Sequence, residues 1–427
     1  MTIHTVQRGD TLTGIAQRYG TSVQRILTDN GLTPEQRLVT GQALLILIPS
    51  ETYTVLPDDT LYTIASRYGI SVITLVQNNP DLANAPLYPG QTLTIRFDND
   101  RIRGLYINGY AYPYIRMPVL RRALPSMTYL TIFGYGFTED GTLIPIDDQP
   151  LINAAYTFNT APVMLLSSMT ENGNFSTERA SLLFRDIELQ NKVLDNIISV
   201  MLEKGYVGLD SDFEYIDPQD VAAYVAFLEN AAARLHVYGF FLNTDLAPKT
   251  SATQEGLLYE AHDYGRIGAI ADTVLLMTYE WGYTYGPPMA IAPINRVREV
   301  VSYAVTEIPP QKIMMGVPTY GYDWPLPFVQ GVTQATVLGA QEAVALAARY
   351  NASIQFDQTA QSPYFNYRDS NGQAHVVWFE DVRSIRQKFN LIDEFSLRGA
   401  GYWNIMRPFA QNWSYISAAY TINRTTQ

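Results

Sequence analysis

From Arg103 onward, short runs of apolar, β-branched and aromatic residues alternate with longer segments in which apolar residues recur every three or four positions. The first pattern is typical of buried strands, and the second of helices that pack on them. Helices are expected between several of the runs, as over 217–234 and 293–305. The runs predict strands at residues 104–109, 128–137, 162–168, 206–216, 237–244, 273–282, 312–321 and 399–406.

Strands that alternate with helices in this way predict an α/β fold, namely a (β/α)8 TIM barrel. A doubly wound open sheet is the alternative, but no G-x-G-x-x-G or P-loop pattern follows any of the runs. The connection before the last strand is too long for a simple turn. Its helical segment (332–350) and its hairpin pattern (365–379) predict a small α+β insertion near 328–380.

The first hundred residues carry one pattern twice, at a constant offset of 49 positions. The segment TVQRGDTLTGIAQRYGTSVQRIL from Thr5 aligns without a gap with TVLPDDTLYTIASRYGISVITLV from Thr54. Similarly, GQALLI from Gly41 aligns with GQTLTI from Gly90. The chain therefore begins with a duplicated module.

Each copy carries the local signals of two short helices between two strands. In the first copy, Asp10 or Thr11 can cap a helix that Gly20 ends, and Ser22 can cap a second helix that ends at Asn30. Helices of two or three turns are marginal alone, so they must pack on the two-stranded sheet. We therefore expect two βααβ units.

Composition narrows the classes of function. The net charge of -12 argues against nucleic acid as a partner, because phosphate contacts need clustered Lys and Arg. There are no cysteines, and the four histidines lack H-E-x-x-H spacing, so we expect no metal and no other cofactor. We find no apolar run of membrane-spanning length and no secretory signal in MTIHTVQRGD. A soluble monomer is expected.

The segment GLDSDFEYI places three carboxylates at alternate positions of a predicted strand: Asp210, Asp212 and Glu214. Side chains at alternate positions share one face of a strand. In a barrel that face can point inward, where carboxylates without partners cost several kcal/mol each. Glu214 falls near the C-terminal mouth, where barrel active sites lie. The pattern therefore indicates function rather than stability.

Three kinds of site fit these acids. A calcium loop would need Gly and Glu where the chain has Tyr215 and Val221, so we set it aside. A structural network of ion pairs is a second reading. Glycoside cleavage by a pair of carboxylates is the third, and we favour it. Asp212 and Glu214 should lie about 6 to 7 Å apart at the backbone, which does not choose between retaining and inverting chemistry.

Segments of the sequence resemble two known protein families. GLDSDFE resembles the fourth-strand signature D-G-x-D-x-D-x-E of glycoside hydrolase family 18. MTYE from Met277 is similar to the sixth-strand M-x-Y-D of that family, and GYWNI to the segment with its eighth-strand tryptophan. The duplicated module resembles LysM, a βααβ unit that binds glycans containing N-acetylglucosamine. The whole chain resembles bacterial LysM and family 18 proteins that degrade spore cortex during germination.

The family 18 resemblance implies a retaining, substrate-assisted mechanism. Glu214 would be the general acid and then the base, and Asp212 would orient the 2-acetamido group that forms an oxazolinium intermediate. Asp210 would hydrogen-bond Asp212 from beneath. Tyr279 would donate to the acetamide oxygen, and Trp403 would form the apolar floor of the sugar site.

The sequence departs from the family pattern at Val207, where an Asp is usual, and at Phe213, which we expect only to pack. Glu280 replaces the Asp that normally follows Tyr279. Aromatic and polar residues near strand ends are further candidates for substrate binding. With Trp403, these are Glu280, Tyr110, Trp281, Tyr320, Trp324 and Asn243.

The LysM resemblance implies a groove between the first strand-helix loop and the second helix-strand loop of each module. We expect modules at 2–48 and 52–97 and a barrel domain at 101–427. The groove residues would be Gly9, Asp10, Thr11, Leu12, Asn30, Gly31 and Leu32 in the first module and Asp59, Thr60, Leu61, Asn79, Pro80 and Asp81 in the second. Asp10 and Asp59 can also be read as helix caps alone, and Asp58 stands where the first module has Gly9.

Together these features predict an N-acetylglucosaminidase that acts on peptidoglycan, in spore cortex or its fragments, and resides in the spore envelope. A chitinase with the same residues is one alternative. A non-catalytic peptidoglycan-binding protein is another, although such proteins usually lack the acid that Glu214 supplies here.

Overall fold

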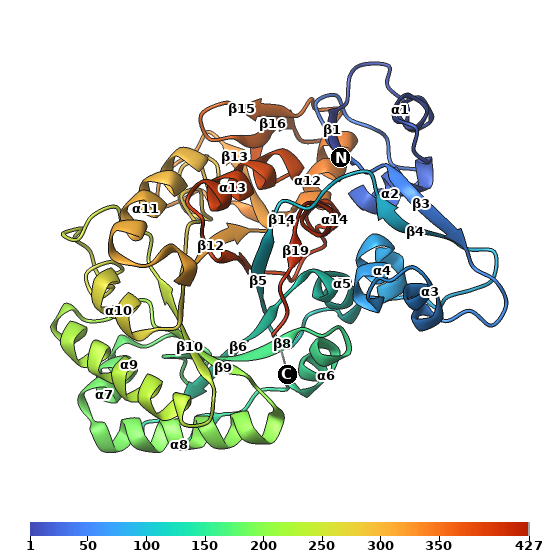
Figure 1. Ribbon diagram of the computed structural model, residues 1–427. Coiled ribbons are helices and arrows are strands. Elements are labelled where there is room, and N and C mark those ends of the chain that lie inside the picture. The colour runs from blue at the N-terminus through green and yellow to red at the C-terminus, as the bar shows by residue number, and fades with distance from the viewer. Residues whose placement is uncertain (426–427) are drawn as a thin grey trace.

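In the computed structural model, which describes residues 1–425, a closed barrel of eight parallel strands forms the larger part of the chain (Figure 1). β5 pairs with β6 on one side and with β18 on the other, which closes the sheet. The predicted TIM barrel is confirmed, and an open sheet is excluded. The barrel strands are β5 (Gly104–Ala111), β6 (Tyr129–Phe137), β8 (Ala161–Ser167), β9 (Gly208–Asp212), β10 (Phe241–Leu246), β11 (Thr273–Leu276), β12 (Ile313–Pro318) and β18 (Gly399–Trp403).

Helices surround this barrel and bury their apolar stripes against it. α8 shows why the sequence forms them: the Asp186 carboxylate accepts from two free N–H groups at its start, and Gly205 adopts φ 82° at its end. The helices are α5 (Met117–Ala123), α6 (Gln149–Thr157), α7 (Thr177–Arg185), α8 (Ile187–Lys204), α9 (Val221–His236), α10 (Tyr264–Ile270), α11 (Ile294–Glu307), α13 (Val382–Glu394) and α14 (Ala410–Ala419). Short elements complete the barrel domain: η2 (Leu124–Ser126), η3 (Pro218–Asp220), η4 (Pro310–Lys312), β7 (Leu143–Ile144) and β19 (Thr421–Ile422).

An α+β insertion follows β12. Its antiparallel sheet has the order β14-β13-β17-β16-β15, with a helix beside it. The sheet starts before residue 328, because the chain turns directly after β12 into β13. The elements are β13 (Tyr320–Leu326), β14 (Thr336–Gly339), α12 (Ala340–Arg349), β15 (Gln355–Asp357), β16 (Ser362–Arg368) and β17 (Ala374–Trp378).

Residues 2–97 form two βααβ units, as the duplicated pattern predicts, and they lie beside the barrel (blue in Figure 1). In the first unit, Thr11 caps one helix and Ser22 caps the other. The first unit contains β1 (Thr2–Thr5), α1 (Leu12–Tyr19), α2 (Val23–Asn30) and β2 (Ala43–Ile46). The second contains β3 (Pro49–Thr54), α3 (Leu61–Arg67), α4 (Val72–Asn78), η1 (Pro80–Ala83) and β4 (Thr92–Phe97).

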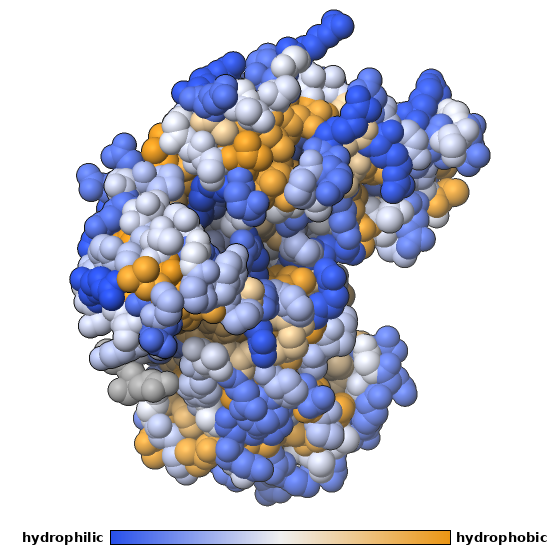
Figure 2. Space-filling model, turned by 90° about the vertical axis from the view of Figure 1, so that its right-hand side faces the viewer, coloured by the Kyte–Doolittle hydropathy of each residue, from blue (hydrophilic) through white to orange (hydrophobic). Residues whose placement is uncertain are grey.

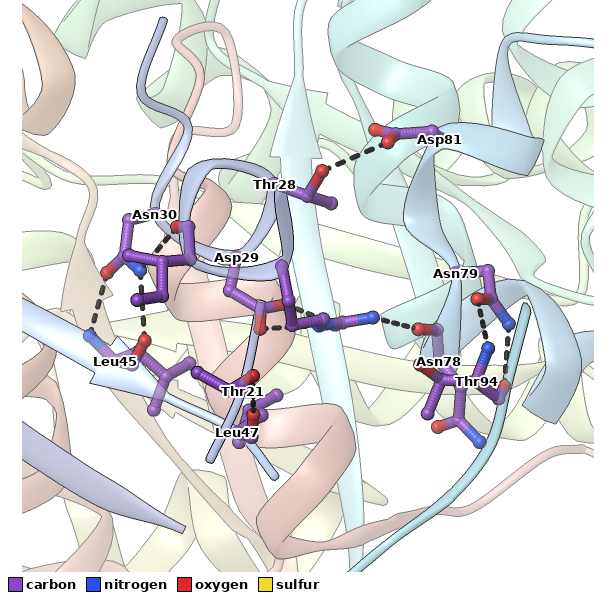
Figure 3. Close-up of polar contacts among 12 residues, drawn as sticks. Thr21, Thr28, Asp29, Asn30, Leu45, Leu47, Asn78, Asn79, Asp81 and Thr94 are labelled. Atoms are coloured by element: carbon purple, nitrogen blue, oxygen red, sulfur yellow. Dashed lines mark hydrogen bonds and ion pairs between the residues drawn. The ribbon is translucent and has the colours of Figure 1, made fainter. Parts of the chain in front are cut away.

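One side-chain contact repeats in both units (Figure 3). The Asn30 amide donates to the Leu45 carbonyl and accepts from the Leu45 N–H, at 2.9 and 2.7 Å. Asn79 makes the same pair of bonds with Thr94, at 2.7 and 2.8 Å. Each asparagine thereby joins the end of a helix to the last strand of its unit.

A buried arginine of the first unit forms an ion pair within that unit and a hydrogen bond to the second unit. Arg25 donates from Nε to the Asp29 carboxylate at 2.6 Å and from Nη1 to the Asn78 carbonyl of the second unit at 2.5 Å (Figure 3). The Asp29 side chain has no exposed surface, and burial raises its pKa while the charge of Arg25 opposes that rise. The guanidinium also lies 4.8 Å from the ring centre of Phe97.

The segment between the second unit and the barrel is held at both ends. Asp98 donates its N–H to the Ile48 carbonyl at 2.9 Å, and Asn99 donates to the Ala418 carbonyl at 2.8 Å. Arg103 pairs with Asp393 at 2.7 Å. The units are therefore docked on the barrel rather than tethered to it. Among residues 1–425, no helix combines the length and the apolarity that a bilayer span needs.

Replacing Arg25 with Ala should destabilise the protein strongly, because it leaves the Asp29 carboxylate buried without its partner. We expect the free energy of unfolding in urea to fall by about 3–5 kcal/mol. The matched control is Arg18→Ala, since Arg18 is 57% exposed and lies 3.5 Å from Asp10. An exposed pair of this kind contributes about 0–1 kcal/mol. Equal losses in the two variants would contradict the role given to Arg25.

Candidate active site

The acid-rich segment lies where β9 leaves the barrel. β9 ends at Asp212, so the predicted strand to residue 216 is too long, and Glu214 lies two residues beyond the strand. Asp210 and Asp212 are 0% and 5% exposed, whereas Glu214 is half-buried. The three acids therefore run from the barrel interior to its C-terminal mouth. Glu214 is the one that solvent or a ligand reaches most easily.

Asp210 is held by groups on three other strands of the barrel, β5, β6 and β10. Tyr110 donates to its carboxylate at 2.8 Å and Asn243 donates at 2.6 Å, while Thr131 lies at 3.4 Å. The expected hydrogen bond between Asp210 and Asp212 is absent among the described residues, because these partners already surround Asp210. Asp210 therefore supports the site through β5 and β10.

A fourth acid, Asp245, belongs to the same cluster and was missed by the sequence analysis. It is 4% exposed, and its carboxylate accepts from Tyr110 at 2.8 Å and from Asn243 at 3.1 Å. These are the two residues that also bind Asp210. A single Asp in an apolar run carries no spacing signal. Its position two residues after Asn243, on the same face of β10, was the only hint.

Asp212 is buried but incompletely satisfied. Its Oδ1 has no hydrogen-bond partner among the described residues. Burial raises its pKa well above the ordinary value, and the charges of Glu214 and Asp210 add to the rise. A buried carboxyl oxygen without a partner is costly in a folded protein. A turn of the side chain toward the mouth would present this oxygen to a ligand as a hydrogen-bond acceptor.

The backbone directly before Glu214 is fixed by a hydrogen bond from His262. The ring of His262 is fully buried, and it bonds the Phe213 carbonyl through Nε2 at 3.1 Å and the Ala247 N–H through Nδ1 at 2.7 Å. Nδ1 accepts the Ala247 N–H, so Nε2 carries the proton. Burial lowers the pKa of His262 to about 4, which keeps this arrangement neutral. Phe213 packs outward against Phe184, as expected.

Burial also raises the pKa of Glu214, and the negative charge of Glu280 raises it further. Glu280 is partly exposed and has φ 67°, which is unfavourable for a residue with a side chain. Its carboxylate accepts from Tyr320 and, at 3.1 Å, from Tyr322. Both tyrosines lie on β13, so Glu280 connects the mouth of the barrel to the insertion.

The apolar part of the site is an aromatic cluster inside the barrel mouth. The ring of Trp403 is half-buried and lies 5.4 Å from Phe133 and 6.0 Å from Tyr112, measured between ring centres. Tyr279 packs in the same cluster. Trp403 therefore presents part of its surface at the mouth, beside the acids.

Several residues predicted to contact substrate have other roles. Tyr110 is 1% exposed and Asn243 is 4% exposed, and both hold acids instead. Tyr320 is 4% exposed and binds Glu280. Trp324 is fully buried and donates to the Gly286 carbonyl at 3.0 Å, so it cannot stack on a sugar. Trp281 packs against the outer core rather than the mouth.

The predicted glycan-binding residues of the modules also differ in their contacts. Asp10 and Asp59 do not cap helices: they accept from the N–H groups of Gln7 and Leu56, at 2.8 Å in both cases. Their neighbours Thr11 and Thr60 are the caps, and Leu12 and Leu61 pack into the apolar cores. Gly9 and Asp58 both have positive φ, 93° and 68°, so the two loops share one geometry.

The second halves of these grooves face the barrel. Asn30 and Asn79 are occupied by the contacts of Figure 3, which makes them structural. Pro80 is buried, and Asp81 pairs with Arg122 of α5 at 2.9 Å. Gly31 and Leu32 line a cleft between the first module and the barrel.

No group of three or more His, Cys, Asp or Glu side chains within residues 1–425 is arranged to hold a metal ion. The groups that bind Asp210 and Asp245 are hydroxyls and an amide. The arrangement can therefore hold protons on buried carboxyls, donate one from Glu214, and accept a hydrogen bond at Asp212.

Comparison with known families agrees with this geometry. The sequence model described as glycosyl hydrolases family 18 matches residues 127–407, and that of the LysM domain matches 4–47 and 53–96. The chain belongs to glycosyl hydrolases family 18. It is therefore a glycosidase, and the acid-lined mouth of the barrel is its candidate site. The role of each residue in that site is a separate question.

Relatives match this family 18 chain over its full length. The cortical fragment-lytic enzyme of Bacillus anthracis is 47% identical over 427 residues, 99% of each chain. The cortical fragment-lytic enzyme of Bacillus subtilis (strain 168) is 46% identical over 432 residues, covering 100% of each. The crystal structure of the spore cortex-lytic enzyme SleL from Bacillus cereus superimposes with a TM-score of 0.84 at 42% identity, over 99% of each chain.

Replacing Asp212 with Asn should stabilise the protein while it removes a carboxylate from the site. Because folding raises the pKa of Asp212, the folded state loses stability as pH rises from the unfolded-state pKa to the raised folded-state pKa, and the amide escapes this loss. We expect the unfolding temperature to rise by about 2–4 °C at pH 7. The gain should vanish near pH 3, where the carboxyl is neutral in both states.

The control for this comparison is Asp195→Asn, because Asp195 is 70% exposed on α8. It should leave the unfolding temperature nearly unchanged at both pH values. A fall in the unfolding temperature of Asp212→Asn at pH 7 would show that Asp212 has a stabilising partner.

Replacing Glu280 with Gln should shift the alkaline limb of the activity profile to lower pH. The charge of Glu280 raises the pKa of Glu214, so its removal lowers that pKa, and the acid loses its proton sooner as pH rises. The measurement is kcat/KM against pH. Tyr322→Phe keeps the charge of Glu280 and removes one of its hydrogen bonds, so its alkaline limb should stay in place.

Proposed function

We propose that this glycosidase is an N-acetylglucosaminidase that cleaves β-1,4 bonds of peptidoglycan, in spore cortex or its fragments. The observation that carries the proposal is the unpartnered Oδ1 of buried Asp212 beside Glu214. An N–H group of a 2-acetamido sugar is a donor suited to that oxygen. The names of the relatives, cortical fragment-lytic and spore cortex-lytic enzyme, support the choice of polymer.

In the first step, Glu214 gives its proton to the glycosidic oxygen as the bond from that oxygen to C1 breaks. The carbonyl oxygen of the 2-acetamido group bonds to C1 and forms an oxazolinium ion. Asp212 accepts from the acetamido N–H and balances the positive charge that develops. The raised pKa of Glu214 fits this step, because the carboxyl must be protonated at working pH.

In the second step, Glu214 is a carboxylate and acts as the base. It takes a proton from a water molecule, whose oxygen bonds to C1 while the acetamido oxygen leaves. Two displacements at C1 retain the configuration of the sugar. Tyr279 donates to the acetamide oxygen, and Trp403 supplies the apolar floor under the ring.

Asp210 and Asp245 act on this chemistry through Tyr110, whose hydroxyl lies 2.8 Å from each of them, and through Asn243, whose amide donates to both. Two buried carboxyls that share donors and have no cation nearby favour retention of a proton between them. That proton limits the negative charge behind Asp212.

The LysM modules, which we assign to 2–48 and 52–97, would hold the polymer while the barrel domain at 101–427 cuts it. Asp10 and Asp59 keep the two exposed strand-helix loops in one conformation. The enzyme would act as a monomer in the spore envelope. Tandem weak sites raise apparent affinity when both reach one polymer.

Replacing Glu214 with Gln should lower kcat on cortex peptidoglycan by about 10²–10⁴-fold, because the amide cannot donate the proton. Binding of the polymer in a pull-down assay should be unchanged. Glu229→Gln, at an exposed position on α9, is the control and should keep full activity. Undiminished turnover by Glu214→Gln would refute the assignment of the acid.

Mass analysis of the wild-type products tests the identity of the bond. New N-acetylglucosamine reducing ends support the proposal, and muramic acid reducing ends refute it. Chitin oligomers in parallel distinguish a chitinase, which would turn them over faster than peptidoglycan.

A further inference from the structure

A cleft of about 450 Å³ lies where the first module, the second module and the barrel meet. Gly31 and Leu32 of the first module form one wall, and Asp81 of the second lies beside them. The barrel contributes Arg116, which directly precedes α5, and Arg122, which lies in the last turn of that helix. The cleft takes in Gly31, Leu32 and Asp81 of the predicted module grooves, and none of the roles given to the barrel residues uses it.

The walls of the cleft are fixed by direct contacts. Gln341 of α12 donates to the Gly31 carbonyl at 2.6 Å. A side chain on Gly31 would meet that amide and displace the Gln341 side chain, and the positive φ of 62° at this position also favours glycine. Arg122 donates to the Thr28 carbonyl at 2.7 Å and pairs with Asp81 at 2.9 Å. The cleft is therefore preformed and does not depend on a loop closing.

The chemistry of the cleft suits an anion better than a sugar ring. Phe409 and Trp413 line it, but they are 1% and 4% exposed, so they offer no face on which a ring could stack. Arg116 is exposed and forms no ion pair within residues 1–425. Arg116 and Arg122 outnumber Asp81 in a chain of net charge -12, so the local charge is opposite to the overall one.

The loop between β5 and α5 connects the mouth of the barrel to the cleft. The ring centre of Tyr112 lies 6.0 Å from that of Trp403, and Tyr112 stacks on Tyr114, which is 75% exposed. Arg116 follows four positions after Tyr112, and four residues span at most about 14 Å. From the side on which the modules lie, hydrophilic residues surround small apolar patches and the outline is deeply indented (Figure 2).

We propose that this cleft binds the carboxylate of a peptide side chain carried by the glycan strand that the barrel cleaves. Arg116 is its main donor, and Arg122 supports it from the wall. A glycan strand with one sugar on Trp403 would carry the peptides of its neighbouring sugars past Tyr114 toward Arg116. The proposal rests on peptidoglycan being the substrate, and it adds recognition of the peptide to recognition of the sugar.

The test compares two substrates that differ only in peptide. One is a peptidoglycan fragment with its peptide side chains, and the other is the same fragment after an amidase has removed them. Arg116→Glu should raise KM for the first substrate by roughly tenfold, the loss of one charge-assisted contact, and leave kcat unchanged. KM for the stripped fragment should not change. Added salt should reduce the difference, because the contact is electrostatic.

Arg121→Glu is the matched control, since Arg121 is exposed on the same helix and does not line the cleft. It makes the same change in net charge and should leave both KM values as in the wild type. Equal effects of Arg116→Glu on both fragments would overturn the proposal and assign the cleft to the glycan backbone. No effect on either would show that the cleft binds no part of the substrate. Failure of the wild type to cleave either fragment would instead refute the proposed function.

Discussion

The constraint on which the site depends is the burial of Asp210, Asp212 and Asp245 at the barrel mouth, where Asp210 and Asp245 have hydroxyl and amide partners and Asp212 has none. Burial raises the pKa of all three acids, and neighbouring negative charges raise the pKa of Asp212 and Asp245 further, so the cluster cannot ionise fully. The barrel tolerates it because Tyr110 on β5 and Asn243 on β10 each bind two of the acids. The same donors thereby tie three strands together at the level of the catalytic residues.

Much of the fold could be predicted because its signals are periodic. The alternation of strand-like and helix-like segments leads directly to the barrel, and the offset of 49 positions leads to the two βααβ units. The residues at which strands end were harder to predict. The alternation of Phe213 and Glu214 continues the pattern of β9, although the strand ends at Asp212, since only strand pairing decides where it stops.

The site was predictable where acids recur at a fixed spacing and unpredictable where a single residue acts. The alternate spacing of Asp210, Asp212 and Glu214 makes these acids recognisable in the sequence, whereas Asp245 is one acid in an apolar run. Arg25 and Asp29 pose the same difficulty: four positions apart, they resemble an ordinary surface pair on a helix. Their burial follows from the packing of α2 between the second unit and α14, which the sequence does not display.

The segment from Asp98 to Arg103 has a further consequence because its ends are hydrogen-bonded to the structures on both sides. A flexible linker would let a bound polymer be cut anywhere within reach. Here the two modules and the acids at the barrel mouth keep one separation and one orientation. A polymer held by both would therefore meet those acids at a set distance from the modules.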